Sequence, residues 1–155
     1  MSHLGPVQQD RTLLHLSREA SYPRGKHSGS VAPFLFLRAY RQLMAFDHLV
    51  HDGTFSELCQ RVRLYPTASN IVPGPSVETV CKAVDVAAIF YRKRLLCLQR
   101  SAATTCLLRR YGFRACMVIG SRILPCRSHA WVELDGTVVN DKPRFCYMYA
   151  ILERF

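Results

Sequence analysis

The chain has 155 residues, of which 49% are apolar, and a formal net charge of +10. This length predicts one domain, and the apolar share is too high for a chain that is disordered throughout. Charged residues interrupt the longest apolar stretch, residues 34–50, so no membrane span is expected. The first 30 residues contain no continuous apolar core of a secretory signal. We therefore expect a cytoplasmic protein.

Residues 1–33 contain the stretch SYPRGKHSGSVAP, which is rich in proline, glycine and serine and has no periodicity. This composition is typical of a poorly ordered extension. We expect a single domain over residues 34–155.

Apolar residues recur at helical spacing in four segments: residues 34–50, 55–63, 77–91 and 97–110. Thr54 and Glu57 have the spacing of a capping box, which predicts the start of the second helix. Ser76 is a plausible N-cap for the third helix. Gly112 follows the fourth helix, where a left-handed C-terminal cap is expected.

After Gly112 the apolar pattern changes from helical to extended. Residues 113–120, 129–134 and 137–141 are predicted strands, and the last two are joined across Asp135-Gly136, a strong hairpin signal. Residues 142–155 are expected to form a last strand or a short helix. Helices followed by a small antiparallel sheet indicate an α+β domain.

The seven cysteines include no C-x-x-C pair, which argues against a zinc site, so no metal or cofactor is expected. Without an export signal a disulfide framework is not expected either. Cys81 and Cys106 lie within predicted helices on the apolar side and are interpreted as core. Cys97 is the cysteine at a predicted helix start, where unpaired N–H groups and the helix dipole favour a thiolate. A buried core thiol is the alternative for Cys97.

His129 is the histidine that lies on a predicted strand beside the core, and Asp141 is a candidate partner for it. A two-residue turn in the hairpin would place Asp141 on the opposite side of the sheet from His129, whereas a three-residue loop would place the two side by side. A catalytic triad therefore predicts the longer loop or a bulge. Trp131 shares the face of His129 and is interpreted as core, and Glu133 is expected to be solvated.

Five segments resemble lasso-peptide leader peptidases: CLQRS at Cys97, LLRRYGF, RACMVIG, SHAWVELDGTVVND and the terminal ERF. These are transglutaminase-like cysteine proteases with a papain-like architecture. The resemblance implies Cys97 as nucleophile, His129 as general base and acid, and Asp141 as the residue that orients His129. It also implies the reaction, which is removal of the leader from a ribosomally made precursor peptide. The resemblance is strong over residues 97–155, weaker over 34–96 and absent from 1–33.

Longer members of this family carry an N-terminal domain that grips the leader peptide, and residues 1–33 are too few to form it. The resemblance therefore implies the split form, in which a separate leader-binding protein acts as partner. The lasso cyclase is a further candidate partner. The positive charge would suit docking of that partner or of the precursor.

Other functions fit parts of the sequence. A different transglutaminase-like acyltransferase or peptidase would share the same triad. A non-catalytic basic binding module would leave Cys97 unactivated. Nucleic-acid binding fits the charge, but the basic residues are dispersed and do not alternate with aromatic residues, so nucleic acid is not expected as a partner.

Overall fold

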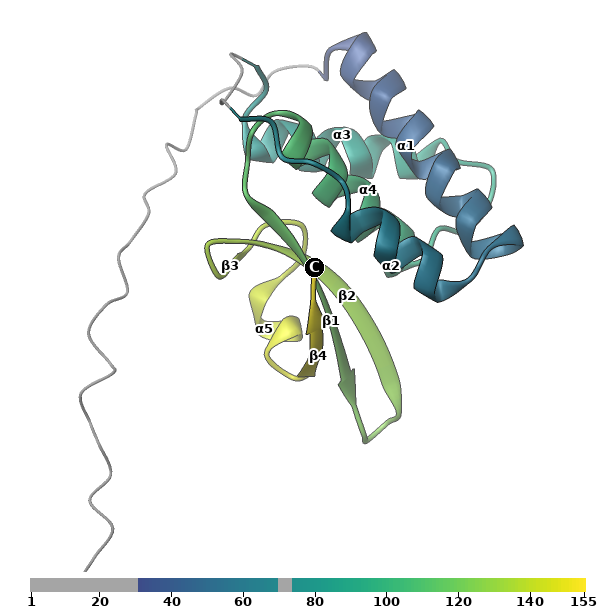
Figure 1. The fold of residues 1–155 in the computed structure, drawn as a ribbon, viewed down its shortest axis with the longest axis vertical. Coiled ribbons are helices and arrows are strands. Elements are labelled where there is room, and N and C mark those ends of the chain that lie inside the picture. The colour runs from purple at the N-terminus through teal and green to yellow at the C-terminus, as the bar shows by residue number, and fades with distance from the viewer. Residues whose placement is uncertain (1–30, 70–73) are drawn as a thin grey trace, which may run out of the picture.

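The computed structural model describes residues 31–69 and 74–155. In these ranges the elements follow one another in this order: α1 (Pro33–Asp52), α2 (Phe55–Arg63), α3 (Val77–Ile89), α4 (Cys97–Arg110), β1 (Ala115–Arg122), β2 (Arg127–Leu134), β3 (Thr137–Val138), α5 (Pro143–Cys146) and β4 (Ala150–Arg154). The predicted order of helices before an antiparallel sheet is confirmed. Figure 1 shows α1 to α4 gathered in one body, with the sheet beside them and the β1–β2 hairpin extending away.

Of the predicted extension, residues 1–33, the first 30 residues lie outside the described part of the chain. Ordered packing begins before residue 34, because α1 starts at Pro33 and Val31 packs against the core. Proline suits the first turn of a helix, where its missing N–H would have no partner anyway.

Local signals set the helix boundaries. The Thr54 hydroxyl accepts the Glu57 N–H at 3.2 Å and the Glu57 carboxylate accepts the Thr54 N–H at 2.7 Å, so α2 begins with the predicted capping box. The Ser76 hydroxyl caps α3 by accepting the Thr79 N–H at 3.3 Å. Gly112 ends α4 with φ of 85°, a conformation that glycine adopts without strain.

The four strands form one antiparallel sheet in the order β3-β2-β1-β4. One face packs on the helices, and α4 crosses β2 and β1 through a core that includes Cys106, Met117 and Val132. The opposite face holds a smaller cluster of Val118, Trp131 and Cys146, the last contributed by α5. Buried residues thus lie on both faces of the sheet. Within the described ranges, every helix is too short or too polar to cross a bilayer.

The hairpin between β2 and β3 has the two-residue turn Asp135-Gly136, with φ of 46° and 79°. Leu134 pairs with Thr137 and Glu133 with Val138, and the ladder assigned to β3 ends there. The predicted strand over residues 137–141 was therefore too long. The three-residue loop or bulge expected for a triad was also wrong, and Asp141 reaches its position by another route.

Candidate active site

Cys97 is the first residue of α4, and a buried polar network holds this end of the helix. The Gln99 side chain accepts the Leu96 N–H at 2.7 Å and donates to Asp47 of α1 at 3.3 Å. Asp47 also accepts from Tyr91 at 2.9 Å and Lys93 at 3.3 Å, both in the loop that leads into α4. Burial opposes ionisation of Asp47, but the bonds from Tyr91 and Lys93 outweigh it and lower the pKa of this carboxyl. The network ties α1, the loop and the start of α4 together.

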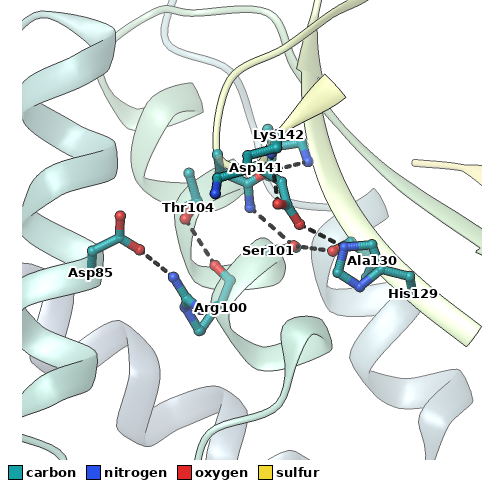
Figure 2. Close-up of polar contacts among 10 residues, drawn as sticks. Asp85, Arg100, Ser101, Thr104, His129, Ala130, Asp141 and Lys142 are labelled. Atoms are coloured by element: carbon teal, nitrogen blue, oxygen red, sulfur yellow. Dashed lines mark hydrogen bonds and ion pairs between the residues drawn. The ribbon is translucent and has the colours of Figure 1, made fainter. Parts of the chain in front are cut away.

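The first turns of α4 meet the edge of β2 beyond the point where β3 ends. The Ser101 hydroxyl donates to the Ala130 carbonyl at 2.9 Å (Figure 2). The backbone N–H groups of Ala130 and Leu98 face the Cys97 sulfur and lower the pKa of its thiol. Backbone groups of β2 that a longer β3 would occupy thus bind the helix that carries Cys97.

Where β3 ends, the side chain of Asn140 replaces a strand residue as the hydrogen-bond partner of β2. Val139 still donates its N–H to the Val132 carbonyl at 3.0 Å, but the Val132 N–H goes to the Asn140 side-chain oxygen at 2.7 Å. The Asn140 amide nitrogen donates to Ser101 at 3.1 Å. The chain leaves the sheet at this point, so strand alternation no longer decides the side on which Asp141 lies. This is how a two-residue turn and a contact between Asp141 and His129 coexist.

His129 and Asp141 form a close ion pair, with 2.6 Å between His129 Nε2 and Asp141 Oδ2 (Figure 2). His129 also makes a side-chain hydrogen bond with Cys97. Because Nε2 faces the carboxylate, Nδ1 is the nitrogen left for the sulfur. The structure therefore brings together all three residues singled out in the sequence, in the order sulfur, imidazole, carboxylate.

The two pKa shifts in this pair run in opposite directions. Burial works against the Cys97 thiolate, but the hydrogen bonds from His129 and the Ala130 N–H outweigh it, so the pKa of Cys97 lies below its ordinary value. The hydrogen bond with Cys97 raises the pKa of His129; burial opposes this, and Asp141 adds to the increase. Together the shifts favour a thiolate beside an imidazolium, which is an activated sulfur nucleophile.

The family of the chain follows from a comparison with known proteins. A model of the transglutaminase-like superfamily matches residues 43–152, which include the whole site. The chain belongs to the transglutaminase-like superfamily. This superfamily includes cysteine peptidases and transglutaminases, both of which use a cysteine nucleophile. No curated protein and no solved structure matches the chain.

The other thiols of this transglutaminase-like chain differ from Cys97. All seven cysteines are free. Burial raises the pKa of four thiols whose positions are Cys59, Cys81, Cys106 and Cys116, and it raises that of Cys146 to about 11. Cys81 and Cys106 are buried, as predicted for core residues. Of the thiols with a resolved shift, Cys97 has the lowered pKa.

One group of side chains has the composition of a metal site. Ligand atoms of His129, Asp141 and Cys146 lie within 4.8 Å of one another. Histidine, carboxylate and thiolate are all zinc ligands, and three of them with a water would complete a tetrahedron. A metal bound there would replace the ion pair between His129 and Asp141, and a metal-bound imidazole could not also become an imidazolium beside Cys97.

Aromatic rings wall the imidazole of this transglutaminase-like site. The ring of His129 lies 5.4 Å from that of Tyr149 and 6.1 Å from that of Trp131. Gly120 leaves room for these rings, because a Cβ there would lie 2.8 Å from Trp131 and 2.9 Å from Tyr149. Trp131 is only 1% exposed, as expected for core. The expectation that Glu133 is solvated was wrong, because it is buried and accepts the Trp131 indole N–H at 2.8 Å.

Four supporting residues were not identified from the sequence: Asp47, Gln99, Ser101 and Asn140. Gln99 and Ser101 lie two and four residues after Cys97 in a predicted helix, and Asn140 precedes Asp141, so proximity in sequence was a usable signal for them. For Asp47, the only signal in the sequence was a charged residue within a predicted apolar helix. Such a residue indicates a buried polar contact but does not name the partner.

Replacing Asn140 by alanine is expected to lower the free energy of unfolding by about 1–3 kcal/mol, because the buried Val132 N–H loses its acceptor. Asn140→Asp keeps that acceptor and is the matched control, expected to be much closer to the parent protein. Urea unfolding followed by circular dichroism measures both. An Asn140→Ala protein as stable as the parent would show that Asn140 does not hold this edge.

Proposed function

We propose that the chain is a leader peptidase in lasso-peptide biosynthesis, working in the cytoplasm by Cys97–His129–Asp141 catalysis. The observation that carries the catalytic part is the hydrogen-bonded series from Cys97 through His129 to Asp141, with its opposed pKa shifts. Support for the leader-peptidase part comes from the sequence resemblance around SHAWVELDGTVVND, within the superfamily match.

In the proposed mechanism, the Cys97 thiolate attacks the carbonyl carbon at the leader–core junction. The carbonyl electrons move onto oxygen, and the Cys97 backbone N–H at the start of α4 is the proposed donor to this oxyanion. The His129 imidazolium gives its proton to the leaving amine as the C–N bond breaks, leaving a thioester on Cys97. His129 then takes a proton from water, whose hydroxide attacks the thioester and releases the leader as a carboxylate and Cys97 as the thiolate.

Asp141 has a supporting part in this proposal. Its carboxylate holds Nε2 of His129 at 2.6 Å, which turns Nδ1 toward the sulfur and stabilises the imidazolium. Tyr149 and Trp131 limit the movement of the ring from its faces. The proposed substrate is the precursor peptide. The proposed partner is a separate leader-binding protein, with the lasso cyclase as a further candidate.

To test the substrate proposal, candidate precursor peptides encoded near the gene for this chain are synthesised. Each is incubated with the protein, in the presence and in the absence of the leader-binding protein encoded nearby. Mass spectrometry should find two fragments whose masses sum to the precursor plus one water. An added amine distinguishes the acyltransferase alternative, because transfer would give a leader amide in place of the leader acid. Intact precursors under all conditions would contradict the leader-peptidase proposal.

Alkylation by iodoacetamide tests the nucleophile without any substrate. Peptide mass spectrometry across pH 5–10 should show Cys97 reacting with an apparent pKa below the ~8.5 of an ordinary cysteine. In His129→Ala the largest factor lowering this pKa is gone, so the reaction should shift to higher pH. Exposed Cys126 serves as the internal reference for reagent and pH. An ordinary pH profile at Cys97, unchanged in His129→Ala, is the result expected of a non-catalytic binding module.

A further inference from the structure

An open hollow of about 510 Å³ lies beside the start of α4, between the end of α3 and the loop that leads to Cys97. Its wall contains four cationic side chains and one carboxylate, which are Arg92, Lys93, Arg94, Arg100 and Asp85. Three apolar residues, Ala88, Ile89 and Leu95, complete much of the remaining lining. We call this the basic hollow. Such a lining suits an occupant with an apolar stem and a negatively charged end.

Part of the positive charge in the basic hollow is already neutralised, and part is not. Arg100 pairs with Asp85 (Figure 2), and Lys93 pairs with Asp47 at 3.3 Å. Arg92 and Arg94 are exposed, and neither forms a hydrogen bond or an ion pair with the described residues. The Nε atom of Arg100 is buried and, among those same residues, has no hydrogen-bond partner. The hollow therefore retains guanidinium donors for an additional anion.

Residues that precede and follow Cys97 in the sequence line the basic hollow. Leu95 lies two residues before Cys97, and Arg100 lies three residues after it on the same helix. Residues three apart on a helix are surface neighbours, with Cβ atoms about 5–6 Å apart. These positions place the edge of the hollow near Cys97, which is not itself part of the lining.

From these observations we propose that the basic hollow is a substrate subsite that binds an aspartate or glutamate side chain near the scissile bond. The proposal rests on the peptidase function proposed above and adds a substrate preference to it. Arginine forks bind carboxylates through paired hydrogen bonds, and Arg92 and Arg94 are the pair with free donors. The apolar lining accommodates the methylene groups of the side chain.

The test uses peptide vinyl sulfonamides, in which the electrophile replaces the scissile bond and glutamate or glutamine stands at successive positions on either side. The Cys97 thiolate adds to the β-carbon of the double bond and the α-carbon takes up a proton, so labelling needs no hydrolysis. Labelling rates at Cys97 are compared for three proteins: the parent, Arg92→Gln/Arg94→Gln, and Arg110→Gln/Arg114→Gln. The last removes the same charge from exposed residues at the other end of α4.

For one position we expect the glutamate probe to label the parent protein about tenfold faster than its glutamine twin. This ratio should fall to about one in Arg92→Gln/Arg94→Gln and persist in Arg110→Gln/Arg114→Gln. Equal rates for each pair of probes in the parent, or a preference that survives in Arg92→Gln/Arg94→Gln, would overturn the subsite while Cys97 remains a working nucleophile. Failure of every probe to label Cys97 would instead contradict the peptidase function, and the subsite with it.

Discussion

Replacing Cys97 by alanine is expected to lower the proposed precursor hydrolysis by at least about 10³-fold, because the proposed reaction loses the atom that forms the thioester. His129→Ala should have a loss of similar size, since in the proposed mechanism the same imidazole activates the sulfur and protonates the leaving amine. Asp141→Asn should cost less, because the His129–Cys97 contact remains. The measurement is the initial rate of fragment formation, with unfolding curves for each protein to exclude loss of the fold.

The matched control for these variants is Cys116→Ala. Cys116 is also half-buried and free, but its pKa is raised by burial, and it packs with Val118 and Trp131 on the face of the sheet opposite the helices. It should retain nearly full activity. A Cys97→Ala protein as active as Cys116→Ala would exclude Cys97 as the nucleophile.

Arg109→Met is expected to lower the free energy of unfolding by about 3 kcal/mol or more. Arg109 is only 8% exposed, and its guanidinium donates to main-chain oxygens of four residues: Val62, Tyr65, Ala115 and Phe155. These oxygens belong to the end of α2, the loop after it, the start of β1 and the residue after β4. Methionine keeps the apolar stem but leaves the oxygens without their donors.

The neighbouring Arg110 provides the control for this prediction. It is exposed, and Arg110→Met should change the free energy of unfolding by no more than about 0.5 kcal/mol. Urea unfolding of the two variants in parallel separates the effect of the buried contacts from the loss of one positive charge. Equal stability of the two variants would show that the Arg109 contacts contribute little.

Local sequence signals were sufficient where the structure depends on local contacts. The capping box of Thr54 and Glu57, the cap at Ser76 and the left-handed Gly112 set helix boundaries through bonds between residues a few positions apart. The position of Cys97 at a helix start followed from the same kind of pattern. The Asp135-Gly136 turn is likewise a property of two adjacent residues.

Prediction failed where side chains distant in sequence decide the outcome. The strand after the turn ends early because Asn140 accepts the Val132 N–H, a contact that no pattern of apolar residues reveals. Glu133 accepts a hydrogen bond at 3.5 Å from Arg154 of β4, which lies 21 residues further along the chain. The Asp47 network likewise joins α1 to residues more than 40 positions further along the chain.

The brevity of β3 sets a limit on how this hairpin can vary. Every further residue that paired with β2 beyond Val138 would compete for backbone groups of Val132 and Ala130. Extension of β3 and attachment of the helix that carries Cys97 therefore require the same backbone groups at the edge of β2. A sequence change that lengthens the ladder would therefore displace the bonds by which Ser101 and Asn140 hold this edge of β2.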